Sequence, residues 1–202
     1  MLKTKEAIEK RRSIRKFKNK KISDKIIIEL LEAARLAPSG CNAQPWRFKI
    51  VKDEKTKQKL YKAAYNQLFV KQAPVVFVCC ADIKGYIDGT ISGAQDLGKN
   101  GALEDRIVNK LCNTAQNLKE MKIEDIEPRI AANVAIAIEH IVLRALDFNL
   151  GTCWVRLLDE KKIKEIFGWD ENIYPVALLP IGFPAEFPKA RKRLKIEELI
   201  ID

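Results

Sequence analysis

Four short segments of the chain carry the side chains best suited to bind a ligand. Residues 11–15 (RRSIR) place guanidinium groups and a hydroxyl within five positions, which suits charge-assisted bonds to a phosphate. Residues 38–46 (PSGCNAQPW) offer amides and a hydroxyl to the polar edge of a heterocycle. Residues 150–154 (LGTCW) form a glycine turn, and residues 181–193 (IGFPAEFPKARKR) add a second group of cations. Each segment alone also fits an ordinary turn or a basic tail.

The chemistry open to this 202-residue chain is limited by its single histidine. His140 alone cannot supply a multi-histidine zinc site or a diiron site, and a Ser/His/Asp mechanism would depend on that one residue. We expect His140 to be a structural residue of a helix. The five cysteines are an odd number without a C-x-x-C pair, which indicates neither a disulfide framework nor a zinc ribbon. We therefore predict no metal site and a reduced, cytoplasmic setting.

The formal charge of +10 is concentrated near both ends of the chain. The first 25 residues hold eleven Lys and Arg against three acids, and residues 189–195 hold five more cations. Such clusters fit solvated surface, a polynucleotide or a phosphorylated small molecule. Phe17 is the only aromatic residue between Lys10 and Lys25, so we expect no nucleic-acid partner. The N-terminus has no apolar targeting run and no stretch has the length of a membrane span, so we expect no membrane contact.

The elements that must position these segments are helices and strands in alternation. Apolar spacing and capping residues predict helices at residues 4–12, 24–37, 54–66, 103–121, 129–148 and 160–167, and strands at 46–52, 74–81, 152–158 and 174–182. This pattern predicts an α/β or α+β sandwich that forms one domain over residues 1–202. No G-x-G-x-x-G follows a strand and no P-loop motif occurs, so a Rossmann or P-loop site is not supported.

Two further segments differ from the rest in composition. Five of the nine glycines lie between Gly85 and Gly101, where few apolar residues line up. Residues 85–128 are therefore either an ordinary long connection or a mobile lid over a site. The helix at 129–148 is hydrophobic around most of its circumference, which predicts a central position that a second subunit could complete.

The four ligand-binding segments resemble, in order and spacing, the nitroreductase-like family of FMN-dependent oxidoreductases from about residue 7 to residue 198. The motifs RRSIRKF, APSGCNAQPW, LGTCW and IGFPAEFPKARKR carry the resemblance. It implies an α+β sandwich in which helices flank a mostly antiparallel central sheet. It also implies a domain-swapped style homodimer with FMN at the subunit interface.

The resemblance implies an activity as well. NAD(P)H would pass hydride through FMN N5 to a nitroaromatic, a quinone or a similar small oxidant by a ping-pong mechanism. The flavin carries the chemistry, so no catalytic residue is expected from the protein.

The phosphate and ribityl contacts of the family map onto cationic and hydroxyl residues at both ends of the chain. They are expected at Arg11, Arg12, Ser13, Arg15, Arg191 and Arg193. The two termini would then meet at one phosphate. Arg15 is the candidate for placing positive charge near the flavin N1/O2 edge, where it would stabilise a reduced flavin.

The contacts to the flavin ring map onto three other segments. Pro38, Ser39 and Asn42 of the partner subunit would contact the isoalloxazine. Either Asn66 or Gln67 matches a family amide that binds the pyrimidine ring. Backbone groups of Val155, Arg156 and Leu157 would approach N5 and O4.

The chain departs from the family pattern in two places, which leaves the substrate open. Arg156 stands where some members carry an acidic residue beside the flavin, and residues 85–128 match no family pattern. Ring dehydrogenation, dehalogenation or flavin breakdown are alternatives within the family, and a non-catalytic flavin-binding protein is another. Cys41 has no partner or base, which is more typical of a packed residue than of a redox thiol.

Overall fold

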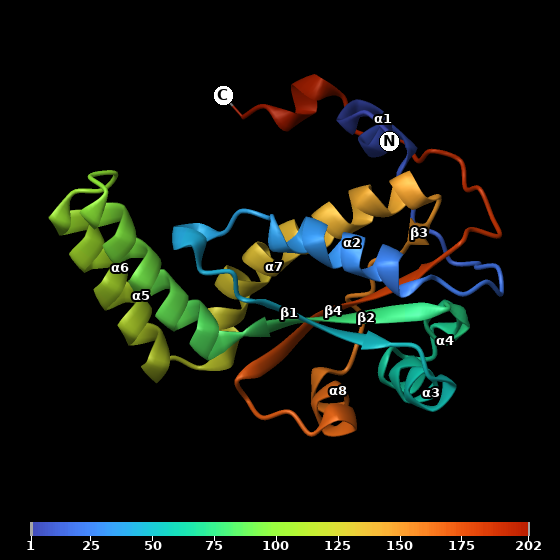
Figure 1. Ribbon diagram of the computed structural model, residues 1–202, viewed down its shortest axis with the longest axis horizontal. Coiled ribbons are helices and arrows are strands. Elements are labelled where there is room, and N and C mark those ends of the chain that lie inside the picture. The colour runs from blue at the N-terminus through green and yellow to red at the C-terminus, as the bar shows by residue number, and fades with distance from the viewer. Residues whose placement is uncertain (1, 202) are drawn as a thin grey trace.

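The computed structural model describes residues 2–201 as a sheet covered by helices on both faces (Figure 1). The sheet contains β1 (Trp46–Val51), β2 (Val75–Asp82), β4 (Ile173–Gly182) and the short β3 (Gly151–Thr152). Their order is β1-β2-β4-β3, and every neighbouring pair is antiparallel. The predicted α+β architecture with an antiparallel central sheet is confirmed.

The central strands are buried on both faces, as their continuous apolar runs predict. In β2 the first seven of eight residues are buried, and in β4 all residues after Ile173 are buried. Phe77 of β2 lies opposite Leu179 of β4 in the middle of the sheet. β1 alternates between buried and more exposed positions because it forms one edge.

One face of the sheet is covered by α2 (Asp24–Arg35) and α7 (Ile123–Ala145), with α1 (Thr4–Lys10) beside the end of α7 (Figure 1). Ser23 caps α2 by accepting a hydrogen bond from the amide of Ile26. His140 Nδ1 lies 3.1 Å from the carbonyl oxygen of Ala33, which joins the two helices. The predictions of a buried central helix and of a structural His140 are both confirmed.

The opposite face is covered by α3 (Glu54–Ala63), α4 (Leu68–Gln72) and α8 (Glu160–Phe167) (Figure 1). Asp159 caps α8 and Gly168 ends it with φ 66°, as predicted. α3 ends three residues early because Tyr65 and Asn66 adopt positive φ angles of 50° and 60°. The short α4 has no apolar periodicity long enough to predict it.

The glycine-rich middle segment forms a helical hairpin that projects from the body (Figure 1). It contains α5 (Ile83–Lys99) and α6 (Asp105–Asn117), followed by η2 (Leu118–Glu120). Residues 85–128 are therefore largely helical, which the glycine-rich composition of 85–101 does not indicate. Glycine lowers helix propensity, but here it permits close packing: a Cβ at Gly93 would overlap the Cys41 carbonyl, and one at Gly89 would lie 2.7 Å from the Ala43 carbonyl oxygen. The lid role stays a prediction.

The predicted strand at 152–158 is mostly absent from the sheet. β3 has only two residues, and beyond it only Val155 makes a bridge, to Leu178 of β4. Leu146–Phe148 (η3) and left-handed Asn149 precede β3 and end the α7 region where predicted. α7 itself begins at Ile123, six residues earlier than expected. Among residues 2–201, no helix combines the length and the apolarity that a membrane crossing requires.

The stability of this fold depends on the α7 side chains that meet the sheet. Ile138 is fully buried in the core between α7, α2 and the sheet. We expect Ile138→Ala to lower the free energy of unfolding by about 2 to 5 kcal/mol, because the surroundings cannot close the cavity. Ile138→Val should cost only about 0.5 to 1.5 kcal/mol. Urea denaturation measures both, and equal costs for the two variants would contradict a tightly packed position.

Candidate functional site

Residues 11–15 run along the edge of the sheet beside β3. Ser13 pairs in parallel with Thr152, and the amide of Ile14 donates to the Thr152 carbonyl at 2.9 Å. A Cβ at Gly151 would overlap the Ile14 side chain, so the approach requires glycine there. In an extended segment alternate side chains point to opposite sides, which separates Ser13 and Arg15 from Ile14.

Ser13 and Arg15 lie beside the turn that follows β3. The Cys153 thiol is buried, and burial raises its pKa against the opposing effects of Arg15 and of a hydrogen bond to Ser13. The Arg15 guanidinium lies 5.9 Å from the centre of the Phe69 ring at the start of α4. Glu186 Oε1 accepts from the amide of Arg15 at 2.6 Å. A cation, a hydroxyl and an aromatic ring are thus gathered at one place.

Gln67 joins the α3–α4 turn to residues 155–157. Its Nε2 donates to the carbonyl oxygens of Ala64 at 3.1 Å and Leu157 at 3.0 Å. Val155 exchanges two backbone hydrogen bonds of 3.0 Å with Leu178 of β4. The backbone of residues 155–157 is therefore held from both sides. Asn66 next to Gln67 is exposed and left-handed.

The Arg156 side chain points toward β4 and α7. Its Nη1 donates to the Val176 carbonyl at 3.0 Å and its Nη2 to Glu127 Oε1 at 3.3 Å. Burial, together with a hydrogen bond to the same Glu127 carboxylate, raises the pKa of Tyr174. The guanidinium is therefore held by a backbone carbonyl and a carboxylate, and the backbone of Arg156 is the part that lies with Leu157.

Pro38, Ser39 and Asn42 lie in the loop before β1, around η1 (Gly40–Asn42). The amide of Gly40 donates to Asn133 Oδ1 of α7 at 2.9 Å, and Ser39 Oγ accepts from the Gln44 amide at 3.0 Å. Asn42 has φ 53°. Figure 1 places η1 and residues 11–20 at opposite ends of α2, so one chain does not bring these loop residues to Ser13 and Arg15.

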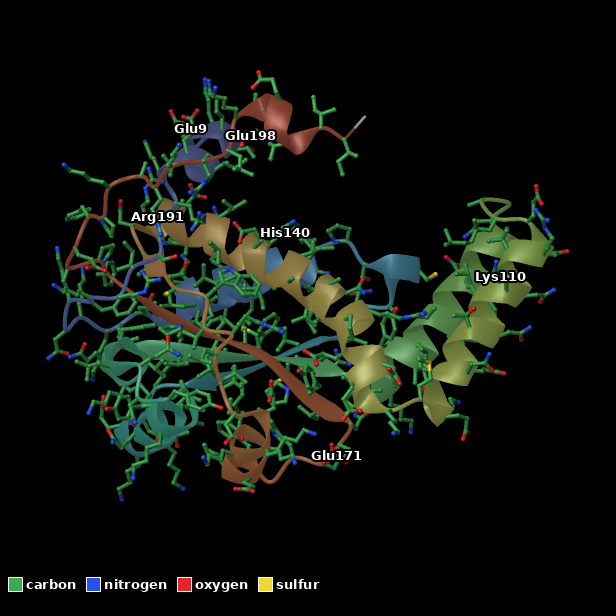
Figure 2. The ribbon with its side chains drawn as sticks, turned by 180° about the vertical axis from the view of Figure 1, so that it is seen from behind. Glu9, Lys110, His140, Glu171, Arg191 and Glu198 are labelled. Carbon is green, nitrogen blue, oxygen red and sulfur yellow. The ribbon has the colours of Figure 1, made fainter. Side chains whose placement is uncertain are left out.

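Arg11 and Arg12 line a different hollow, a cavity of about 770 Å³ between α1, the end of α7 and residues 183–188. Arg12 Nη1 donates to the carbonyl oxygens of Glu9 and Arg11, both at 2.7 Å. Arg191 and Arg193 are exposed in the C-terminal tail, and Arg193 Nη1 bonds to its own backbone at Arg191 and Lys192. Figure 2 places Arg191 at the same end of the molecule as Glu9 of α1, so the basic ends do lie near each other.

Sequence reasoning missed three residues of this region. They are Phe69, Glu186 and Glu127. The signal for Glu186 was available, since it is the only acid within a basic segment, whereas Phe69 and Glu127 are recognised only from tertiary contacts. Burial raises the pKa of Cys41, in keeping with a packed thiol. Within residues 2–201, no group of three or more His, Cys, Asp or Glu side chains is arranged to hold a metal ion.

The two donated bonds of Gln67 predict a measurable contribution to stability. We expect Gln67→Ala to lower the free energy of unfolding by roughly 1 to 3 kcal/mol, because two backbone carbonyls lose their donor. Gln67→Glu should cost at least as much, since a carboxylate offers those carbonyls no proton at neutral pH. Chemical denaturation of the three proteins tests this, and a neutral Gln67→Glu would argue against the bonds.

Comparison with known proteins supplies relatives that match over nearly the whole chain. The nitroreductase family model matches residues 8–183. A Thermus thermophilus protein named NADH dehydrogenase is 29% identical, over 100% of this chain and 96% of the relative. The Bacillus subtilis protein YdgI, provisionally named NAD(P)H nitroreductase, is 32% identical over 96% of this chain and 94% of the relative.

A solved structure adds agreement in three dimensions. An Exiguobacterium sibiricum protein, provisionally described as a nitroreductase and solved in complex with FMN, superposes with a TM-score of 0.79 at 27% identity. The match covers 100% of this chain and 97% of that one. The resemblance stated from the motifs is confirmed, and the chain belongs to the nitroreductase family.

Proposed function

We propose that this chain transfers hydride from NAD(P)H to a small oxidant, at an FMN site formed between two copies of the chain. The chain is an FMN-dependent oxidoreductase of the NAD(P)H nitroreductase type, which its named relatives and the FMN complex of a related structure support. The observation that carries the proposal is the gathering of Ser13, Arg15, Gln67 and the backbone of residues 155–157 at one edge of the sheet.

The residues at this edge fit FMN by their chemistry. Among residues 2–201, Arg15 has no carboxylate within ion-pairing distance, so its charge is available to an anionic group. Gln67 donates both hydrogens of its Nε2 to backbone carbonyls, which leaves its Oε1 as an acceptor for a ring N–H. Phe69 and the exposed Leu157 offer apolar surface to a planar ring.

When bound, FMN would supply two-electron chemistry at N5, which would let NAD(P)H react first, and a nitroaromatic, a quinone or a similar oxidant second, at one site. The protein groups would position the flavin and stabilise its reduced form. Arg15 would hold positive charge near the N1/O2 edge, and the held backbone of Val155, Arg156 and Leu157 would face N5 and O4. Arg11, Arg12, Arg191 and Arg193 would neutralise the phosphate. No protein side chain has to exchange a proton with the substrate.

The second copy is required because one chain leaves its site incomplete. The loop around η1, which contains Pro38, Ser39 and Asn42, stands at the other end of α2 from residues 11–20. A homodimer that places the η1 loop of one copy over residues 155–157 of the other would complete the contacts to the ring. Figure 1 also shows the C-terminal tail running away from the sheet, as an arm that exchanges between subunits would.

Several predictions made from sequence stay predictions. These are the single domain over residues 1–202, the cytoplasmic location, the identity of the oxidant and the absence of a nucleic-acid partner. Ring dehydrogenation, dehalogenation and flavin breakdown are alternatives for the same site, and a flavin carrier without activity is another.

Purified protein tests the proposal directly. We expect it to bind FMN with visible flavin absorbance and to oxidise NADH or NADPH in the presence of a nitroaromatic. Double-reciprocal plots at several oxidant concentrations should be parallel, as for a ping-pong scheme. Protein that neither holds nor takes up FMN contradicts the proposal, and flavin binding without turnover would favour the carrier.

The terminal arginines have a separate prediction. We expect Arg11→Ala and Arg193→Ala each to weaken FMN binding by roughly 1.5 to 3 kcal/mol, as for a lost charge-assisted hydrogen bond to a phosphate. Titration of FMN into the apoprotein measures the change. Lys110→Ala is the control, because Figure 2 shows Lys110 on the projecting hairpin at the other end of the molecule. Unchanged affinity in both arginine variants would show that the basic ends are ordinary surface.

A further inference from the structure

Two segments hold the entire positive excess of the chain. Residues 10–21 and 183–195, here called the terminal cationic segments, contain 13 of the 37 Lys and Arg but one of the 27 Asp and Glu. The other 177 residues therefore carry 24 cations and 26 acids, close to neutrality. Charge of one sign that is concentrated in so small a part of the sequence creates a local positive potential that can attract anions, beyond any general effect of charge on solubility.

The fold places the terminal cationic segments side by side. The Lys18 amide donates to the Phe183 carbonyl at 2.8 Å, and the Ala185 amide donates to the Lys16 carbonyl at 2.9 Å. Lys20 Nζ lies 4.2 Å from the centre of the Phe183 ring. In the part of the chain that the structure describes, none of the 13 cations forms an ion pair, although ten pairs occur elsewhere.

The cavity of about 770 Å³ opens within this cationic surface. Its cationic rim consists of Lys10, Arg11, Arg12 and Lys18. Its walls are apolar, with Val142 from the end of α7, Leu146 and Leu150 from the segment between α7 and β3, and Phe187 from the C-terminal tail. Ligand cavities typically pair apolar walls with a few convergent polar groups, and this one suits a planar base that carries a phosphate.

Two acids also line the cavity, but both have partners. Asp147 accepts from Arg144 Nη1 at 2.7 Å and from the Leu2 amide at 2.6 Å. Glu9 lies 3.9 Å from Lys5 Nζ. The net field at the rim therefore remains positive.

The flavin phosphate accounts for only part of this charge. A phosphomonoester carries about two negative charges at pH 7, which a few arginines can balance. The cavity adjoins the candidate flavin site along one extended segment: Arg11, Arg12 and Ile14 line the cavity, whereas Ser13 and Arg15 lie beside Cys153. Because Arg11 and Arg12 are assigned to the flavin phosphate, Lys10 and Lys18 are the lining cations left for a second phosphate. From Arg11 to Arg15 an extended segment spans about 13 Å, so an extended dinucleotide can reach from one side to the other.

We propose that this cavity binds the adenosine 2′-phosphate end of the reductant, so that the enzyme prefers NADPH to NADH. The inference rests on the proposed function, because it assumes that a nicotinamide dinucleotide is the electron donor. The apolar walls receive the adenine, and Lys10 and Lys18 neutralise the 2′-phosphate, which is the only group that distinguishes the two dinucleotides.

Calorimetry on the FMN-loaded protein tests the site without turnover. The probes are 2′,5′-ADP and 5′-AMP, which represent the adenosine ends of NADPH and NADH. We expect 2′,5′-ADP to bind at least about tenfold more tightly at low salt, as for one or more charge-assisted contacts to the extra phosphate. The advantage should shrink as salt rises, because the rim is open to solvent.

Variants then locate the effect. Lys10→Ala/Lys18→Ala should remove most of the preference for 2′,5′-ADP and lower the NADPH-to-NADH ratio of kcat/KM, with kcat/KM for NADH changed little. Lys99→Ala/Lys110→Ala, on the distant hairpin, removes the same charge and should leave both quantities unchanged (Figure 2). Circular dichroism and retained flavin absorbance show that the variants are folded and loaded.

The outcomes separate the two proposals. Equal affinity for the two probes overturns the inference while FMN-dependent oxidation of NADH leaves the proposed function standing. If the preference for 2′,5′-ADP survives Lys10→Ala/Lys18→Ala, or if the hairpin control lowers it equally, the cavity is not the site that recognises the 2′-phosphate. Protein that takes up no FMN contradicts the proposed function itself, whatever the probes do.

Discussion

The close approach of residues 11–15 to β3 is the constraint on which the candidate site depends. Ile14 packs against Gly151 where no other side chain fits, and Ser13 pairs with Thr152. This pairing places Ser13 and Arg15 beside Cys153 and aligns the following residues with the start of the tail at Pro184. Two parts of the sequence some 170 positions apart thereby lie side by side at one edge, which brings Ser13 and Arg15 close to the start of the C-terminal tail.

The same fold keeps the η1 loop, which is expected to contact the flavin ring, away from residues 11–15 of its own chain. The η1 loop rests on α5, where Gly89 and Gly93 allow helix and loop backbones to touch, and on α7 through Asn133. These contacts hold the loop at the far end of α2 from residues 11–20. A rigidly held loop cannot fold back across the body of its own chain, so the proposed division of the site between two copies would follow from packing rather than from a flexible arrangement.

The sequence predicted most elements because their signals are local. Caps at Ser23 and Asp159 and the buried runs of β2 and β4 need no tertiary information. α5 escaped prediction because its glycines are accommodated by contacts with a loop about 50 residues away. At the site, the motifs identified the segments but not the directions of the side chains. The Arg156 guanidinium donates to Glu127, and the Gln67 amide donates to the carbonyl oxygens of Leu157 and Ala64. Such directions depend on neighbours that a motif does not contain.

Within residues 2–201, charged side chains of the body form ion pairs, whereas those of the terminal cationic segments do not. The ten ion pairs lie outside the terminal cationic segments, several of them within one helix, as where the exposed Arg35 pairs with Glu32 of α2. Exposed pairs of this kind contribute about 0 to 1 kcal/mol each, so pairing the terminal cations in the same way would have cost the fold little. They are instead left unpaired and adjacent, where mutual repulsion opposes folding. An arrangement that weakens the free protein but favours a bound anion would be explained by the proposed phosphate ligands, because their binding would remove the repulsion that folding has to overcome.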